Sequence, residues 1–325
     1  MKLKNLASSV RTLINSPDRL YNALKRMGRD FNQDVDDLKF IHGQELIYLQ
    51  KILNTSDIHE SEFKIFSQFG NDGIIQWIIS KIGSQIPHTF IEFGVENYEE
   101  SNTRFLLMHD NWKGLIIDGS QKNIDHVKHS SYYWKNDVTA VSEFITRENI
   151  NKIFTDNKFS GEIGILSIDI DGNDYWIWKE INSVSPCVLI CEYNSVFGGN
   201  KKVTIPYNEK FYRANYLGGG GHFSYLYWGA SISAFTDLSE KKGYSCIGSD
   251  SVGNSVFFVR NDFKNYFKVM TSSEAYVESK IRESRDENGK LNFLSGSARL
   301  EAIKDMPIYD IDQDKILKIS ELYEM

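Results

Sequence analysis

Acidic side chains end several short apolar runs in this chain. Glu92 and Gly94 close a run that begins at Phe90, and Asp118 closes a second run 24 residues after Gly94. A glycine in the turn after a strand lets the backbone approach a ligand closely, and a carboxylate at the end of the next strand can accept hydrogen bonds from ribose hydroxyls. The spacing therefore predicts a βαβ unit that binds a nucleoside.

The turn after Gly94 lacks the further glycines of a dinucleotide-binding loop. Glu96 and Glu99 stand two and five residues after Gly94, where such a loop has its second and third glycines. Two carboxylates at these positions would repel a pyrophosphate, so NAD and FAD are disfavoured. The pattern favours a ligand that has adenosine but no phosphates, and S-adenosylmethionine is the common one.

A second acidic cluster follows a later apolar run. Asp169, Asp171 and Asp174 fall within six residues, and Glu192 ends the next run. Like charges held together raise one another's pKa unless a cation or a proton relieves the repulsion. Asp171 and Glu192 are candidate ligands of Mg²⁺ or Mn²⁺, and Asp171 and Asp174 are candidate catalytic residues, with Asp174 as general base. The alternative is a solvated turn whose Asp caps a helix.

Two further segments hold polar residues in turns. Residues 67–73 precede a helical pattern, and Gln68 or Asp72 in this segment could reach an amino-acid moiety, although a helix cap is the simpler interpretation. Four glycines at 218–221 precede His222 and several aromatic residues, which is typical of a mobile loop beside a substrate. His222 is a candidate catalytic base, with an exposed loop histidine as the alternative.

The elements that position these residues alternate between strands and helices from residue 62 onward. Apolar runs without alternation indicate strands covered on both faces, hence an α/β fold with a Rossmann-like, mostly parallel sheet and helices on both faces. Ligands of such sheets bind outside the carboxyl ends of the strands, where the acidic residues stand. The expected strands are 88–93, 114–118, 163–170, 187–193 and 255–260, and the expected helices are 71–82, 99–109, 141–157, 174–182 and 231–242.

We expect three parts: a helical N-terminal extension over 1–61, the Rossmann-like domain over 62–262, and a helical C-terminal extension over 263–325. Residues 1–30 hold seven Lys or Arg and two Asp. They form either an amphipathic segment that contacts an anionic membrane or a lipid-linked substrate, or a helical arm packed on the domain or on a second copy in a homo-oligomer.

Composition excludes several classes of protein. The net charge of −7, with no strongly basic domain, argues against nucleic acid as the partner. No run of 18 apolar residues and no apolar signal core is found, so neither a membrane span nor secretion is expected. Three cysteines are too few for a disulfide framework. The expected compartment is the cytoplasm, with peripheral contact at the inner face of the membrane.

These segments together resemble the class I S-adenosylmethionine-dependent methyltransferases, and more narrowly the FkbM-type proteins of bacterial polysaccharide biosynthesis. The resemblance covers residues 62–262 and rests on Ser67-Gln68 with Asp72-Gly73, Glu92-Phe93-Gly94, Asp118, residues 167–172, Glu192, residues 227–231 and residues 253–260. It implies a sheet whose last strand is antiparallel. It also implies a set of cofactor-binding residues, with Glu92 and Gly94 at the methionine end, Asp118 on the ribose and Asp137 near the adenine: Gln68, Glu92, Gly94, Asp118, Asp137 and Asp169.

Some metal-dependent sugar methyltransferases of this fold have Asp-x-x-His at the fourth strand end and Glu-Asp at the fifth. Here Asp174 stands in place of the His, and Tyr193 in place of the second Asp. The expected function is methyl transfer from S-adenosylmethionine to a sugar hydroxyl of a glycan, sugar nucleotide or glycolipid. The alternatives are a non-catalytic binding module in polysaccharide assembly and a divalent-metal enzyme that does not use S-adenosylmethionine.

Overall fold

The computed structural model describes residues 17–214 and 218–324. The chain divides into two compact units, residues 1–53 and 54–325. The described part of the first unit is one helix, α2 (Pro17–Leu53). Among the described residues, no helix is long and apolar enough to cross a membrane.

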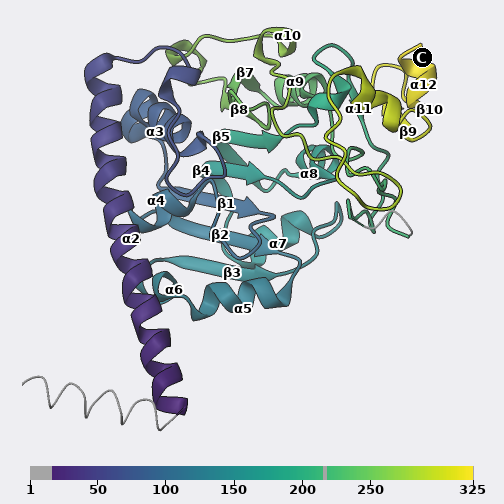
Figure 1. Ribbon diagram of the computed structural model, residues 1–325. Coiled ribbons are helices and arrows are strands. Elements are labelled where there is room, and N and C mark those ends of the chain that lie inside the picture. Colours follow the sequence, from purple (N-terminus) through teal and green to yellow (C-terminus); the bar gives the residue numbers. More distant parts are fainter. Residues whose placement is uncertain (1–16, 215–217, 325) are drawn as a thin grey trace, which may run out of the picture. The chain divides into compact units, whose positions relative to one another are not determined.

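The second unit is built on a seven-stranded sheet of order β3-β2-β1-β4-β5-β8-β7 (Figure 1). The first five strands in this order run parallel, and β8 runs antiparallel to both of its neighbours. The predicted Rossmann-like, mostly parallel sheet is therefore confirmed, together with its antiparallel last strand. The strands are β1 (Thr89–Phe93), β2 (Lys113–Asp118), β3 (Val138–Ser142), β4 (Gly161–Ile168), β5 (Val184–Glu192), β7 (Tyr244–Ser249) and β8 (Ser255–Arg260).

Helices cover both faces because the inner strands are apolar on both faces. In β4, Leu166 belongs to one buried cluster and its neighbour Ile165 to the other, since successive side chains of a strand point to opposite faces. The cluster of Leu166 includes α7 (Ile150–Asp156), α8 (Asp174–Glu180) and α9 (Ile232–Lys241). The cluster of Ile165 includes α3 (Asn71–Ile82), α4 (Arg104–Met108), α5 (Gln121–His129) and α6 (Ser131–Lys135).

The strand order reverses at β1. From β1 the chain builds β2 and β3 on one side, and it then returns to place β4 on the other side. In open α/β sheets, ligands bind outside the carboxyl ends of the strands at such a reversal point. The ends of β1, β2, β4 and β5 therefore mark the edge where a ligand is expected.

The predicted elements are wrong in three places. The helix expected over 99–109 begins only at Arg104 and ends at Met108. A helix was expected over 141–157, but β3 extends to Ser142 and α7 begins only at Ile150. The segment 263–325, expected to be helical, has only the short helices α10 (Ser272–Ala275), α11 (Ser297–Ala302) and α12 (Ile319–Leu322) in its described part, with a hairpin of β9 (Pro307–Asp310) and β10 (Lys315–Lys318). The Asp310 carboxylate accepts from the amides of Asp312 and Gln313, so it stabilises the hairpin turn.

The C-terminal hairpin belongs to a second, smaller sheet. Strand β9 pairs with β6 (Val203–Thr204) in a three-stranded antiparallel sheet of order β10-β9-β6. Because β6 comes from the chain that follows β5, the C-terminal segment packs with the loops beyond the main sheet. Short 3-10 turns at His59–Ser61, Gly83–Gln85, Ser195–Phe197 and Lys264–Tyr266 complete the described elements.

Candidate functional site

Gly94, the first residue after β1, packs directly against Asp169, the first residue after β4. Gly94 has a φ of 79°, and a Cβ at this position would lie 1.3 Å from the carbonyl oxygen of Asp169. The Gly94 amide donates to the carbonyl of Ile117 in β2 at 3.0 Å. Only glycine permits this close approach of the ends of β1 and β4.

The loop after Gly94 is tied to the carboxylate of Asp118. Asp118 is 9% exposed, and its Oδ2 accepts from the Glu96 amide at 2.9 Å. Its Oδ1 accepts from the Ser120 amide at 2.8 Å and from Asn123 Nδ2 at 3.1 Å. A carboxylate has about four acceptor positions. Asp118 therefore keeps one position, on Oδ2, for a hydroxyl of a ligand.

The predicted role of Asp137 near an adenine is wrong. Asp137 precedes β3 instead of following it, so it lies at the opposite edge of the sheet. Its carboxylate is 3.9 Å from Nζ of Lys113, at the start of β2. Phe144, which sequence reasoning missed, follows β3 instead; it is 51% exposed and lies next to Gly119, beyond the end of β2. The sequence pattern favoured a helix over 141–157, which would place Phe144 away from the strand ends.

Four buried carboxylates hold loops of this unit through backbone amides. In each case burial raises the pKa above the usual value, and the hydrogen bonds act in the opposite direction. These residues therefore shape the loops. The contacts are Glu92 with Ser101, Asn102 and Thr103, Asp72 with the amides of 65–67, Asp174 with the amides of Ile170 and Gly172, and Asp250 with the amides of 253–255.

The geometry of Asp174 fits neither a general base nor a solvated helix cap, because its carboxylate accepts from loop amides that precede α8 and not from amides of the helix. Asp174 is fully buried at the first position of α8, and each of its oxygens accepts from a backbone amide at 2.8 Å. The amides are those of Ile170 and Gly172. No surface of the carboxylate is left for a substrate hydroxyl. Glu92 was expected at the methionine end of the cofactor. Its carboxylate instead accepts hydrogen bonds from the loop over 101–103.

Asp174 should make the stability of the protein depend on pH. Burial raises its pKa to about 6, from about 4 in the unfolded chain. The folded state then binds the proton more tightly, so this contribution is fully present below pH 4 and is lost as the pH rises through 6. The loss amounts to about 3 kcal/mol. In urea titrations between pH 4 and 7.5, Asp174→Asn should show a correspondingly flatter profile than the unmodified protein; parallel profiles would contradict the raised pKa.

Asp169, which is partly exposed, and Glu192, which is 9% exposed, are the two remaining carboxyl groups of the cluster. Asp169 follows the end of β4 and Glu192 ends the neighbouring strand β5, so the two carboxyl groups act on each other electrostatically. Burial, followed by the charges of the neighbouring carboxylates, raises the pKa of both well above the usual range. Oε2 of Glu192 is buried without a hydrogen-bond partner among the described residues. Two carboxyl groups that share one proton keep a further oxygen that can accept a second proton.

Asp171 is paired with Arg213, a residue that sequence reasoning missed. Nη1 of Arg213 donates to Oδ1 of Asp171 at 2.5 Å, and the guanidinium lies 4.8 Å from the ring centre of Trp228. The two residues are 42 positions apart, so no local pattern signals the contact. Within residues 17–214 and 218–324, no group of three or more His, Cys, Asp or Glu side chains could hold a metal ion. Arg213 is the cation that pairs with Asp171 in this structure, and the metal role expected of Asp171 and Glu192 stays a prediction.

Gln68 and His222 lie in loops. The Gln68 side chain is exposed, and its backbone carbonyl accepts from Lys64. His222 is half-buried, with Nδ1 2.8 Å from Oγ of Ser224 and its ring 4.1 Å from that of Phe223. Burial lowers the pKa of His222. The described contacts do not join His222 to the carboxylates, so its catalytic role stays a prediction.

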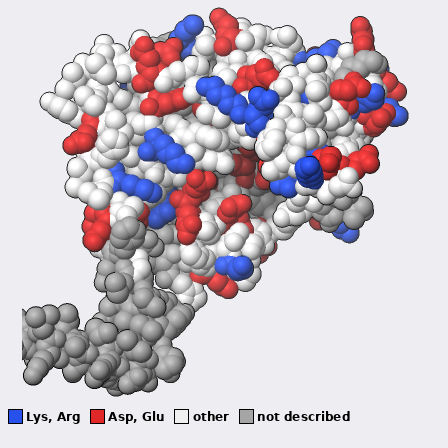
Figure 2. All heavy atoms as spheres, viewed as in Figure 1, with Lys and Arg blue, Asp and Glu red and all other residues white. Residues whose placement is uncertain are grey.

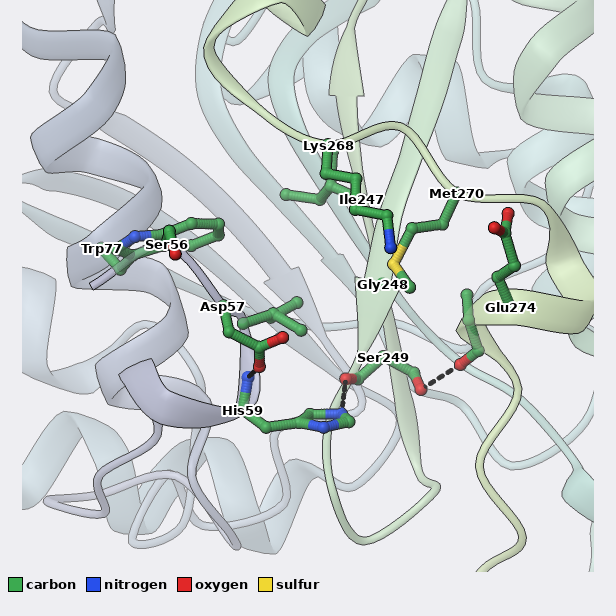
Figure 3. A pocket seen from close by; sticks show the side chains of 12 residues that line it. Ser56, Asp57, His59, Trp77, Ile247, Gly248, Ser249, Lys268, Met270 and Glu274 are labelled. Carbon is green, nitrogen blue, oxygen red and sulfur yellow. Dashed lines mark hydrogen bonds between the residues drawn. The ribbon is translucent and has the colours of Figure 1, made fainter.

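Figure 2 shows how charges are distributed on one face of the molecule. Acidic side chains lie in a hollow near the middle of this face, and basic side chains lie on its rim. A separate cavity of about 70 Å³ lies beside β7, with Trp77, His59 and Lys268 in its wall (Figure 3). This cavity is lined by none of the predicted site residues, and ligand sites for drug-sized molecules measure about 300 Å³ or more. We therefore place the candidate site at the strand ends.

No protein-family model and no curated protein matches this sequence. Solved structures that are similar to it include the N-terminal domain of EvdMO1 with SAH bound, at 10% identity over 67% of this chain and 96% of that chain, with a TM-score of 0.39. An O-methyltransferase from Bacillus cereus in complex with SAH has 14% identity over 67% and 90%, with a TM-score of 0.36. The plantazolicin methyltransferase BamL has 14% identity over 71% and 99%, with a TM-score of 0.37. The function proposed below rests on this chain's own residues.

Proposed function

We propose that this chain is an S-adenosylmethionine-dependent methyltransferase. The observation that carries the proposal is the arrangement at the reversal point of the sheet. There the Gly94 turn lies against the end of β4, and Asp118 keeps an acceptor position at the end of β2. The exposed side chains of Glu96 and Glu99 occupy the positions where a dinucleotide-binding loop approaches phosphates. A nucleoside cofactor without phosphates suits this edge.

We propose further that the acceptor is a sugar hydroxyl of a glycan, sugar nucleotide or glycolipid, as the resemblance to FkbM-type proteins implies. A hydroxyl needs a group that takes its proton, and the Asp169–Glu192 pair supplies oxygens at the adjoining strand ends. Aromatic faces stack on sugar rings, and Tyr212, which is 61% exposed, lies in the same segment as Arg213.

In the proposed reaction, the ends of β1 and β2 bind the cofactor, and the ends of β4 and β5 act on the acceptor. The cofactor, when bound, supplies an activated methyl group on a sulfonium. Asp118 and the loop after Gly94 hold the ribose, which places the methyl group towards the ends of β4 and β5. The Asp169–Glu192 pair accepts the proton of the acceptor hydroxyl, and Arg213 holds Asp171 beside it. Much of the acceleration comes from holding the acceptor oxygen in line with the bond that breaks.

Calorimetric titration tests the cofactor assignment. We expect micromolar binding of S-adenosylmethionine and S-adenosylhomocysteine, and equal affinity with Mg²⁺ or with EDTA because Asp171 pairs with Arg213. Absence of binding under both conditions would overturn the methyltransferase assignment. It would leave two alternatives, a non-catalytic module in polysaccharide assembly and a divalent-metal enzyme that does not use S-adenosylmethionine.

We infer in addition that the protein acts in the cytoplasm and that residues 1–30 contact the inner face of the membrane. Seven basic residues against two acidic ones support this contact. Residues 1–16 lie outside the described part. Deleting residues 1–30 should abolish sedimentation with anionic vesicles at low salt and leave cofactor affinity unchanged. Failure of the full-length protein to sediment with them would exclude the contact.

A further inference from the structure

Helix α2 carries a row of exposed apolar side chains in its C-terminal part. Leu38, Ile41, Tyr48 and Ile52 are 66%, 56%, 65% and 59% exposed. Together with Glu45 they are spaced alternately by three and four residues, which is the spacing of the a and d positions of a coiled coil. We call these five residues the α2 seam. At the rise of an α-helix the seam is about 20 Å long.

The α2 seam is not the only apolar face of this helix. Leu46 and Ile47 lie outside the seam spacing and are partly buried. At about 3.6 residues per turn, their side chains point away from the seam. A helix that packs on one surface needs only one apolar stripe. The seam is a second stripe, and it therefore calls for a partner of its own.

The exposed apolar area suits a stable contact with another protein chain. Leu49 and Leu53 adjoin the α2 seam and are 47% and 73% exposed. These two side chains and the four apolar ones of the seam would bury about 600 Å² per copy at about 100 Å² each, which approaches the ~800 Å² per partner of a standard interface. Monomeric proteins rarely leave a contiguous apolar patch of this size in water.

The charges around the α2 seam disfavour a lipid surface as the partner. Residues 33–53 contain four acidic residues and only two lysines. Helices that lie on anionic membranes are rich in Lys and Arg on their polar face. This part of α2 is thus opposite in sign to residues 1–30, and a protein partner fits it better.

The charges along α2 also favour an antiparallel arrangement of two copies. Asp37, Gln44 and Lys51 are exposed and recur every seven residues, so they flank the seam on one side. In an antiparallel dimer centred on Gln44, Asp37 of each copy would lie beside Lys51 of the other. A parallel dimer would instead place the two Glu45 side chains opposite each other within the seam, where like charges repel.

We propose that the protein forms a homodimer in which the α2 seams of two copies pack against each other in antiparallel orientation. The apolar side chains of the seam supply the buried area, and ion pairs between Asp37 and Lys51 hold the two ends of the contact. The dimer does not depend on the reaction proposed above.

Sedimentation equilibrium of the full-length protein tests the dimer. Ile41→Glu should raise the dissociation constant of the dimer about a hundredfold, because it places a second carboxylate in the seam beside Glu45 of the other copy. Ile316→Glu is the matched control, since Ile316 on β10 is 59% exposed and lies outside α2. It should leave the dissociation constant within about twofold. A monomer at every soluble concentration, or equal losses in both variants, would overturn the proposal.

An exchange of charges tests the antiparallel orientation. Asp37→Lys and Lys51→Asp should each weaken the dimer about tenfold, because each variant brings like charges together at both ends of the contact. The double variant restores opposite charges, so its dissociation constant should return to within about threefold of that of the unmodified protein. A double variant as weak as the single ones would contradict the antiparallel pairing.

Sedimentation with anionic vesicles separates a second copy from a lipid surface. The unmodified protein and Ile41→Glu should sediment with the vesicles to the same extent at low salt, because the seam is occupied by the other copy. Loss of vesicle binding in Ile41→Glu, in a protein that is monomeric without vesicles, would assign the seam to the lipid surface and overturn the dimer.

Discussion

Gly94→Ala should lower the free energy of unfolding by about 4 kcal/mol or more, the largest stability loss that we expect from any single methyl group in this chain. The added Cβ would lie 1.3 Å from the carbonyl oxygen of Asp169. Two backbones would have to separate, because no flexible side chain can move out of the way. The φ of 79° adds the cost of a left-handed alanine.

Gly161→Ala is the matched control for this experiment. Gly161 has a φ of 69°, close to that of Gly94, but no atom lies within 4 Å of its Cβ position. It should lose only about 1–2 kcal/mol, the cost of the left-handed conformation. Urea unfolding of both variants therefore isolates the contact between the ends of β1 and β4. Equal losses would show that this contact is not tight.

Asp118→Ala should weaken binding of S-adenosylmethionine about a hundredfold. The substitution removes the carboxylate that is expected to hold the ribose. It also frees the amide of Glu96, which Asp118 fixes at 2.9 Å, so the loop after Gly94 loses an anchor. Calorimetry on the variant and on the unmodified protein measures the ratio of dissociation constants.

Asp137→Ala serves as the control for Asp118→Ala. Both residues are aspartates next to the neighbouring strands β2 and β3, but Asp137 lies at the opposite edge of the sheet, with its carboxylate near Lys113. We expect its cofactor affinity to be unchanged. A similar loss in both variants would mean that the cofactor does not bind at the ends of β1 and β2.

The sequence predicted the elements whose signals are local. The helix over 71–82 and the strand over 255–260 agree with the structure to the residue, because apolar runs and turn residues mark their ends. The short strand at Val138–Ser142 was missed. The helix expected over 141–157 overlaps its end, and the resemblance implied a strand before Asp137 instead of after it.

The roles of the acidic residues were predicted less well, because they depend on contacts that a linear pattern does not contain. The sequence placed Glu92, Asp118, Asp169 and Glu192 at strand ends, and they are there. It could not show that the carboxylates of Glu92 and Asp174 accept hydrogen bonds from backbone amides of nearby loops. Nor could it find Arg213, which lies 42 positions from Asp171 and becomes its ion-pair partner only through folding.

The four loop-holding carboxylates have a consequence for how this protein can diverge. Each one and the amides that it binds lie between 2 and 11 positions apart in sequence, so each loop is a self-contained segment. A mutation or insertion between two such segments leaves their internal bonding intact. Relatives of this chain could therefore exchange the stretches between them, and with those stretches the ligands that they contact, while the four loops themselves are inherited unchanged.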